Sequence, residues 1–313
     1  MVFRIVPTMF PNVQDAIDAS SEGDSIKILA GKFDGFEVDV DNLKIFGCGI
    51  GRTIIEGAPS QGSSNGVAVN ANRIILQAFT VQGFTGDGVF VESGNNNVLK
   101  DIESRFNGSD GFDLRTDNNL IINCVASFHS ENETGFQLTS LSEHTCIITC
   151  NSFRNGTGYQ TASGVNNNGI GNKFISNIAK ENSVGVDLDN LNGPDGFNTF
   201  IKNKVFLNNT GFRIDVNNNN VINNIVCNNA GNGYDVGISD NNIIDSNIVR
   251  NNGTDVTDAG TLVNDGATSN TIRFNKARNN IEFDIEALGN AFNNNTFDGN
   301  QCGSSDPPSI CDS

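Results

Sequence analysis

The chain has 313 residues with 34 glycines, about 50 asparagines and no tryptophan, and 37% of the residues are hydrophobic, which excludes a collagen-like or wholly disordered chain. The excess of turn-forming residues over helix formers predicts a β-rich protein. A formal net charge of −17 disfavours nucleic acids and anionic membranes as partners, and no apolar stretch approaches the length of a membrane helix. Residues 1–7 lack the long apolar region of a signal peptide, which leaves open a removed leader, release by lysis or assembly inside the cell.

The N-terminal part predicts a cap. Residues 11–20 have the apolar spacing of a short amphipathic helix, and Asn12 is placed to cap its first turn. Such a helix would cover the open end of a larger fold. Residues 23–33 have turn, strand and turn character, so residues 1–33 are predicted to form an N-terminal cap and the first strand.

A repeat follows the cap and continues almost to the C-terminus. A glycine that precedes an alternating strand recurs every 22 to 27 residues, at Gly66, Gly88, Gly111, Gly135, Gly158, Gly185, Gly211 and Gly233. A second pattern, Asn-x-[Ile/Phe/Val]-x-x-Asn-x-[Val/Ala/Phe]-x-x-Asn, lies between these glycines and is clearest at 198–208, 219–229, 242–252, 270–280 and 290–300. Each repeat therefore supplies three short strands and three polar corners.

One repeat cannot bury its apolar side chains alone, whereas stacked repeats form a continuous core. The prediction is an all-β, single-domain solenoid of about ten to eleven coils with parallel strands, about 4.8 Å between coils, and neighbouring coils in register. The coils are expected over residues 34–300, and residues 301–313 are expected to form a C-terminal cap.

Aligning the repeats predicts two columns of core side chains. The first consists of Ile74, Leu99, Ile121, Ile147, Phe174, Phe200, Val221, Ile244, Ile272 and Phe292. The second follows the repeat glycine and consists of Phe112, Phe136, Tyr159, Val186, Phe212 and Tyr234.

The asparagines need their own explanation, because asparagine is a poor strand former and is costly to bury without partners. At a corner it tolerates left-handed backbone angles, and its amide can donate and accept between coils. Three ladders are predicted. The first is Asn72, Asn97, Asn119, Thr145, Asn172, Asn198, Asn219, Asn242, Asn270 and Asn290; the second is Gln77, Ile102, Cys124, Cys150, Asn177, Asn203, Asn224, Asn247, Asn275 and Asn295; the third is Gln82, Asn107, His129, Asn155, Asn182, Asn208, Asn229, Asn252, Asn280 and Asn300.

The order of these features resembles a known superfamily. A helix, then Glu22-Gly23-Asp24-Ser25-Ile26, then Gly31-Lys32-Phe33, and then the asparagine repeats are similar to the right-handed parallel β-helix proteins of the pectate lyase-like superfamily. The short β-helix repeats of copper-maturation periplasmic proteins and of many bacterial surface proteins are the most similar type. The resemblance covers residues 11–300 and implies a right-handed parallel β-helix, but it does not specify a function.

The seven cysteines predict one disulfide. Cys302 and Cys311 flank a loop with two prolines after the last coil, which favours a disulfide-closed C-terminal cap. Cys124 and Cys150 occupy one ladder position in adjacent coils, about 5 Å apart, so both a disulfide and a pair of buried thiols remain open there. The cysteine and histidine spacings do not match a zinc site.

The alternation after each glycine predicts a face of outward side chains. On three adjacent coils, this face gathers Asp187, Asp189, Arg213, Asp215 and Asp235, which we take as the hypothetical catalytic face. The carboxylates could form an acid pair for glycosidic cleavage. A second interpretation is a calcium site of Asp187, Asp189 and Asp215, and a third is a solvated acidic face that Arg213 partly neutralises.

Enzyme signatures of the superfamily are missing from the sequence. Neither the Asn-Thr-Asp and Gly-His-Gly motifs of polygalacturonases, nor the Asp-Pro-His of alginate epimerases, nor the Arg-x-Pro-x-x-Arg of pectate lyases is present. Arg213 is a candidate lyase base by position alone. Aromatic platforms for sugars are also not evident, because Phe90 is the one aromatic residue that the alignment places outward.

Two functions follow from these patterns. The first is a non-catalytic surface or structural β-helix, associated with a cell, spore or virion surface, that contacts polysaccharide or a surface protein. The second is a polysaccharide lyase or glycoside hydrolase that uses the acidic face, with Ca²⁺ as its only expected cofactor. The expected location is extracellular or on a surface, and both a monomer and a trimer like those of tailspike proteins remain open.

Overall fold

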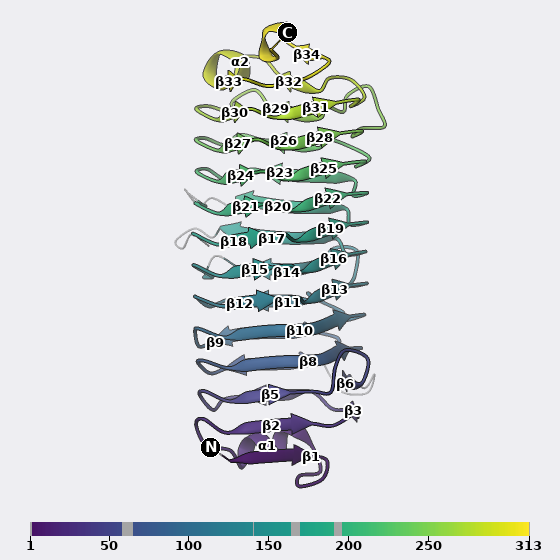
Figure 1. Cartoon of the computed structure of the whole chain (residues 1–313), viewed down its shortest axis with the longest axis vertical. Coiled ribbons are helices and arrows are strands. Elements are labelled where there is room, and N and C mark those ends of the chain that lie inside the picture. Colours follow the sequence, from purple (N-terminus) through teal and green to yellow (C-terminus); the bar gives the residue numbers. More distant parts are fainter. Residues whose placement is uncertain (1, 58–64, 140, 164–169, 191–195, 313) are drawn as a thin grey trace. The chain divides into compact units, whose positions relative to one another are not determined.

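The computed structural model describes residues 2–57, 65–139, 141–163, 170–190 and 196–312. It divides into two compact units, residues 1–156 (unit 1) and 157–313 (unit 2). In each unit the chain turns repeatedly through short strands that pair in parallel with those of the next coil (Figure 1). The fold is the right-handed parallel β-helix predicted from the repeat. None of the helices in the described ranges is long and apolar enough to cross a membrane.

Unit 1 contains one helix and 16 strands. They are β1 (Phe3–Val6), α1 (Val13–Asp18), β2 (Ser25–Ile28), β3 (Gly31–Phe33), β4 (Phe36–Val38), β5 (Lys44–Phe46), β6 (Thr53–Glu56), β7 (Val67–Asn70), β8 (Ile75–Gln82), β9 (Val89–Ser93), β10 (Val98–Arg105), β11 (Phe112–Leu114), β12 (Leu120–Ile122), β13 (Val125–Ser127), β14 (Thr134–Leu138), β15 (Cys146–Ile148) and β16 (Asn151–Phe153).

Unit 2 continues the same pattern. Its elements are β17 (Thr157–Ser163), β18 (Lys173–Ile175), β19 (Ile178–Lys180), β20 (Val184–Asn190), β21 (Thr199–Ile201), β22 (Lys204–Phe206), β23 (Thr210–Ile214), β24 (Asn220–Ile222), β25 (Ile225–Cys227), β26 (Tyr234–Val236), β27 (Ile243–Asp245), β28 (Ile248–Arg250), β29 (Thr261–Val263), β30 (Thr271–Arg273), β31 (Lys276–Arg278), β32 (Ile285–Ala287), α2 (Ala291–Asn294), β33 (Thr296–Asp298), β34 (Ser305–Asp306) and the 3-10 turn η1 (Pro308–Ile310).

One sheet, which we call the glycine sheet, receives one strand from each coil. In unit 1 its order is β4, β7, β9, β11, β14, and in unit 2 it is β17, β20, β23, β26, β29, β32, β34. The solenoid therefore has about 12 turns, slightly more than the ten to eleven expected. One reason is that residues 305–306, expected to belong to the C-terminal cap, still pair with β32.

Helix α1 closes the first coil as its sequence predicted. The side-chain oxygen of Asn12 accepts a hydrogen bond from the backbone N–H of Asp15, which satisfies one of the free donors of the first turn. Val13, Ala16 and Ile17 are buried against β1, β2 and β4. The helix thus removes the apolar end of the first coil from water.

The core columns are in register, with two corrections. In unit 1, Leu99 is level with Leu76, so Leu76 takes the place predicted for Ile74, which is also buried. In unit 2 the column of Phe174, Phe200, Val221, Ile244 and Ile272 continues to Phe297 and not to Phe292. Residues 291–294 form α2 instead, which shifts the register of the last coil by five residues.

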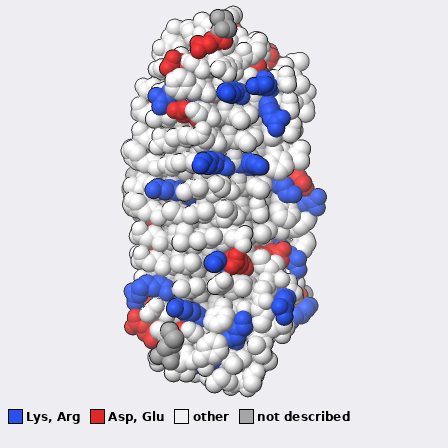
Figure 2. All heavy atoms as spheres, viewed as in Figure 1, with Lys and Arg blue, Asp and Glu red and all other residues white. Residues whose placement is uncertain are grey.

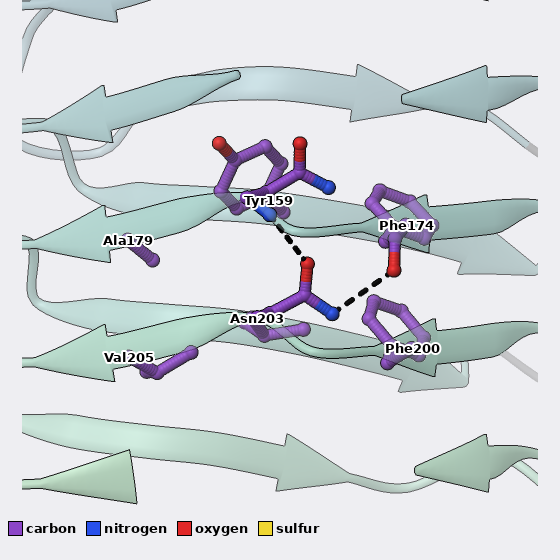
Figure 3. A pocket seen from close by; sticks show the side chains of 8 residues that line it. Tyr159, Phe174, Ala179, Phe200, Asn203 and Val205 are labelled. Carbon is purple, nitrogen blue, oxygen red and sulfur yellow. Dashed lines mark hydrogen bonds between the residues drawn. The ribbon is translucent and has the colours of Figure 1, made fainter. Parts of the chain in front are cut away.

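The buried asparagines of unit 2 hydrogen-bond from coil to coil. Figure 3 shows one of them, Asn203, whose Oδ1 accepts from the backbone N–H of Asn177 at 2.9 Å. Its Nδ2 donates to the carbonyl of Phe174 at 3.0 Å and to Oδ1 of Asn224 at 2.9 Å. Each amide thus satisfies a backbone donor in the coil before it and a backbone acceptor, so its burial is compensated.

The corner itself is divided between two neighbouring residues. The residue before the buried asparagine adopts the left-handed conformation, as Asn223 does with φ 57° and Asn228 with φ 57°. The following residue, Asn224 or Asn229, is buried and makes the hydrogen bonds between coils. Asn-Asn pairs are frequent because each position favours asparagine for a different physical reason.

The last coil differs from the predicted ladders because of α2. Asn270 bonds to Asn295, which was assigned to the second ladder, and Asn275 bonds to Asn300, which was assigned to the third. Asp284 receives the bonds from Asn280 that Asn300 was expected to receive. Asn290 precedes α2 and is not part of the first ladder.

Two cysteine predictions are resolved. Cys302 and Cys311 form a disulfide with Cα atoms 5.6 Å apart, as expected for the C-terminal cap. Cys124 and Cys150 are both buried and are not joined by a disulfide, and the backbone N–H of Cys124 donates to Sγ of Cys150 at 3.3 Å. These two thiols therefore replace asparagine amides as weak acceptors rather than forming a disulfide.

His129 takes the place of a ladder asparagine in unit 1, and unlike an asparagine it can change its charge with pH. Its Nδ1 accepts from the backbone N–H of Asn107 at 3.3 Å, so the neutral ring carries its hydrogen on Nε2, which lies 3.2 Å from the carbonyl of Ser104. Burial disfavours the charged imidazolium and lowers the pKa of His129 to about 4. The folded protein therefore keeps this histidine neutral at pH values where an unfolded chain would protonate it.

Replacing one buried asparagine should cost much more than replacing its exposed neighbour. We expect Asn224→Ala to lower the free energy of unfolding by about 2–4 kcal/mol, because the backbone N–H of Asn203 and the carbonyl of Phe200 each lose a buried partner. Asn223→Gly, at the exposed left-handed position, should stay within about 0.5 kcal/mol. Denaturant unfolding measures both; equal losses would contradict the division of roles.

The His129 site predicts a pH dependence of stability. Because the pKa of His129 is about 4 in the folded chain and near 6.5 in an unfolded one, stability is present above pH 6.5 and is lost as the pH falls toward 4. His129→Asn should remove up to about 3 kcal/mol of the difference in unfolding free energy between pH 8 and pH 4. His144→Asn, whose ring is 61% exposed, is the control and should leave that difference unchanged.

Candidate functional site

The parallel register of unit 2 brings the five residues of the predicted acidic face onto neighbouring strands. Asp187 of β20 is level with Arg213 of β23, and Arg213 is level with Asp235 of β26. Asp189 lies two residues further along β20, and Asp215 directly follows β23. Because alternate residues of a strand face the same side, all five project from one side of the glycine sheet.

Asp187 and Arg213 form the centre of the acidic face. Arg213 Nε donates to Asp187 Oδ1 at 2.8 Å, and Arg213 Nη2 donates to Oδ2 of the same carboxylate. Asp187 is only 1% exposed, although its position predicted a solvent-facing side chain, because the half-exposed Arg213 covers it. Burial raises the pKa of Asp187 and the bonds from Arg213 oppose that rise.

The other carboxylates of the acidic face are more open. Asp215 lies 3.8 Å from Arg213 Nε with 37% of its side chain exposed. Partial burial raises the pKa of Asp215, with Arg213 acting against and Asp187 and Asp235 adding to the rise. Asp235 Oδ1 accepts a hydrogen bond from Asn264 Nδ2 at 2.7 Å, and Asp189 is half-buried.

The pairing of Arg213 limits what the acidic face can do. The hydrogen bonds that Arg213 donates to Asp187 stabilise the charged guanidinium and raise the pKa of Arg213, so this residue is poorly suited to act as a lyase base. Both oxygens of Asp187 already receive hydrogen bonds from a cation. The set of Asp187, Asp189 and Asp215 therefore does not fit a calcium ion, because Arg213 holds the place that the ion would need.

A second carboxylate group, which the sequence analysis did not single out, lies in unit 1. Asp87, Asp110 and Asp113 each offer an oxygen within 4.8 Å of the other two. Asp87 Oδ1 accepts from the backbone N–H of Asp110 at 3.0 Å, and Asp110 Oδ1 accepts from the backbone N–H of Thr134 at 2.6 Å. We call these three residues the aspartate cluster.

Burial and mutual repulsion raise the pKa values of carboxyl groups in the aspartate cluster. Removal from water raises the pKa of Asp110 to about 7, and the charges of Asp87, Asp113 and Glu133 add to the rise. Burial also raises the pKa of Asp113 to about 6, although Arg115 donates to its carboxylate. The cluster therefore holds at least part of a proton near neutral pH, and perturbed carboxyl groups of this kind mark functional sites more often than others do.

A signal for the aspartate cluster exists in the sequence. Asp87 and Asp110 directly precede the repeat glycines Gly88 and Gly111, so they occupy one position in adjacent coils. The glycine at 111 allows the coils to approach closely, since a Cβ there would lie 2.5 Å from the carbonyl oxygen of Gly135. Asp113 then lies three residues further on, across a bend whose geometry the repeat does not specify.

Three phenylalanines, one exposed and two half-buried, form an aromatic platform on unit 1 that was also not expected. The rings of Phe106 and Phe128 are stacked with centroids 4.9 Å apart, and Phe153 meets Phe128 edge-on at 5.6 Å. Phe106 is 56% exposed. Arg105 lies over the Phe106 ring, and Arg154 lies 5.2 Å from the Phe128 centroid. Phe90, the one aromatic residue predicted to face outward, is instead 9% exposed beneath Arg115.

The aromatic platform borders a shallow groove of about 500 Å³. The backbone of the adjoining corners forms the rest of the lining, which includes Gly83, Thr85, Gly108 and Ser130. An open groove with an apolar side and many backbone polar groups fits an extended ligand better than a small compact one.

The interior of unit 2 offers no comparable site in the part of the chain that the structure describes. The space beside Tyr159, Phe174, Phe200 and Asn203 is lined by packed core side chains and has no room for a water molecule (Figure 3). Stacked Phe174 and Phe200 rings, 4.4 Å apart, fill it. It is part of the core.

The charges of the surface are unevenly spread. Figure 2 shows a face on which most side chains are uncharged, with Lys and Arg in small groups and fewer Asp and Glu. Since the chain has 36 acidic and 19 basic residues, little of the acidic excess lies on this face.

Comparisons with known proteins support the fold. No protein-family model matches the sequence, and no curated protein matches it either. Among solved structures, the A-module of the mannuronan C-5 epimerase AlgE6 of Azotobacter vinelandii is similar with a TM-score of 0.79 and 16% identity, over 93% of this chain and 88% of that one. The AlgE4 A-module of the same organism has a TM-score of 0.74 and 15% identity, with 93% and 90% covered.

A pectate lyase, Pel9A, is also similar, with a TM-score of 0.61 and 14% identity over 93% of this chain and 72% of that one. At such identities the likeness concerns the fold alone. The chain thus has a right-handed parallel β-helix fold, like these structures.

The ion pair between Asp187 and Arg213 should stabilise the folded protein. Asp187→Asn is expected to lower the unfolding free energy by about 1–3 kcal/mol, since it weakens a bidentate, half-buried pair. Asp215→Asn on the same face should change it by less than about 0.5 kcal/mol. Thermal or denaturant unfolding distinguishes the two variants. An Asp187→Asn variant as stable as the unaltered protein would show that the ion pair does not stabilise the fold.

Proposed function

We propose that this protein is a non-catalytic β-helix that binds polysaccharide along the aromatic platform of unit 1. The observation that carries the proposal is the row of Phe106, Phe128 and Phe153, of which Phe106 is exposed and the other two are half-buried, beside an open groove. Contiguous exposed apolar surface is unfavourable in water and often marks an interaction site.

Backbone strain at the platform supports a functional role. Phe106 and Phe128 have φ angles of 52° and 58°, a conformation that is unfavourable for a bulky side chain. The equivalent corners of unit 2 carry Glu181, Leu207, Asn228, Asn251 and Asn279, and the asparagines among them tolerate this conformation well. Two phenylalanines that hold a costly conformation beside one groove support a role for the aromatic rings themselves.

The chemistry of the platform suits a sugar chain. The C–H groups on one face of a pyranose ring pack against an aromatic ring, while its hydroxyl groups need polar partners. Here the rings lie on successive coils, so consecutive sugars of an extended chain could each meet one. Arg105 and Arg154 beside the rings supply donors for hydroxyl or carboxylate oxygens.

The solved structures that share the fold support the same direction. They include a mannuronan epimerase, a pectate lyase, an α-1,3-glucanase and a tailspike protein. We infer from them, and from the disulfide between Cys302 and Cys311, a protein that works outside the cytoplasm on a cell, spore or virion surface. A surface protein is a second kind of partner that the stacked coils could contact.

A polysaccharide lyase or hydrolase remains the second candidate function. The observation in its favour is the raised pKa of Asp187 and Asp215 on the acidic face, because a carboxyl group that stays protonated longer can serve as a general acid. The engagement of Asp187 by Arg213 weighs against it, since that carboxyl group is already bonded on both oxygens.

The double variant Phe106→Asn, Phe128→Asn tests the binding proposal. We expect at least a tenfold loss of affinity for the polysaccharide that the unaltered protein retains in a glycan array or affinity electrophoresis. The unfolding free energy should change by less than about 1 kcal/mol, because the lost ring stacking is offset by relief of backbone strain.

Leu207→Asn is the matched control, because Leu207 is 52% exposed with φ 58° at the equivalent corner of unit 2. It should leave binding unchanged. Release of reducing ends or unsaturated sugars from the same panel, abolished by Asp215→Ala, would instead establish the enzymatic candidate. Retained binding by the double variant would refute the platform.

A further inference from the structure

The two arginine–aspartate pairs of the glycine sheet differ in one respect. In unit 2, Arg213 bonds to both oxygens of Asp187. In unit 1, Arg115 Nε and Nη2 both donate to the same oxygen, Oδ2 of Asp113, at 3.1 and 2.8 Å. Asp113 Oδ1 is therefore left buried without a hydrogen-bond partner among the described residues, although Asp113 is only 4% exposed.

Asp113, which carries that unpartnered oxygen, belongs to the aspartate cluster. Asp113, Asp87 and Asp110 each contribute one oxygen to a group in which all three lie within 4.8 Å of one another. A buried carboxylate oxygen without a donor costs free energy, and two further carboxylates beside it increase the cost. A proton, a bound water molecule or a cation at the cluster would relieve it, and of these only a cation also offsets the repulsion while all three carboxylates stay charged.

We propose that Asp87, Asp110 and Asp113 together bind one divalent cation with oxygen ligands, for which calcium has the best dimensions. Calcium–oxygen distances of about 2.3–2.6 Å allow two ligand oxygens on one ion to lie up to about 5 Å apart. The separations in the cluster, all within 4.8 Å, fall within this limit, and magnesium is less suited because it loses its bound water reluctantly and demands near-ideal octahedral geometry.

Backbone contacts hold the carboxylates of the cluster in place. The N–H groups of Asp110 and Thr134 fix the side chains of Asp87 and Asp110, and Arg115 fixes that of Asp113 from the other side. A bound cation would thus join the corners before Gly88 and Gly111 to strand β11. This site is separate from the aromatic platform, so the cation proposal and the proposed glycan binding can fail independently.

The test uses the full chain, freed of metal with a chelator and then titrated with calcium chloride. We expect one ion per chain by isothermal titration calorimetry and a rise in melting temperature of at least about 3 °C at millimolar calcium, since a ligand of the native state stabilises it. Magnesium at the same concentration should give a smaller rise.

Asp110→Asn and Asp113→Asn should abolish both calcium signals. Without calcium, Asp110→Asn should melt no lower than the unaltered protein, because the amide removes repulsion between carboxylates, and this shows that the variant is folded. Asp215→Asn, on the acidic face of unit 2, should keep the full response. No heat and no shift with the unaltered protein would mean that a shared proton, and not a cation, occupies the cluster; a full response in Asp110→Asn would equally overturn the proposal.

Discussion

The structure depends on the hydrogen bonds that buried asparagine side chains make between coils. An amide such as that of Asn203 accepts from the backbone of one coil and donates to carbonyl and amide oxygens around it, so it is satisfied only when the neighbouring coils are in register. A slip of one residue would leave several buried polar groups unpaired and would turn the core side chains outward. The coils within each unit are therefore held in one alignment.

This alignment explains why residues that are far apart in the sequence lie together on the surface of a unit. Residues 26 and 22 positions apart, such as Asp187, Arg213 and Asp235, lie side by side only because the asparagines keep the strands level. The same arrangement gives different chemistry in the two units. Arg213 satisfies both oxygens of Asp187, whereas Arg115 leaves one oxygen of Asp113 unpaired among three carboxylates. The ion pair of unit 2 and the candidate cation site of unit 1 therefore differ in whether the arginine bonds to one or to both oxygens of the aspartate.

The corners combine constraint with variation. Their left-handed residue is exposed and makes few demands other than a tolerated backbone angle, so its side chain is free to differ from coil to coil. Asparagine is the commonest residue at these positions, but Phe106 and Phe128 accept the same unfavourable conformation, and the Phe106 ring is exposed. The adjoining buried residue makes this variation possible, because its hydrogen bonds hold the coil in place whatever side chain precedes it. Function can thus be added at corners without disturbing the core.

The sequence by itself determined the solenoid, the capping role of Asn12, the C-terminal disulfide and the neighbouring positions of Asp187, Arg213 and Asp235, because each follows from a local signal or from the period of the repeat. Only the tertiary structure decided the burial of Asp187, the convergence of Asp87 and Asp110 with Asp113, and the shift that α2 introduces in the last coil. A repeat specifies which residues are stacked in successive coils. It does not specify how sharply the chain bends between two positions of one coil, and that bend sets whether side chains on either side of a corner meet.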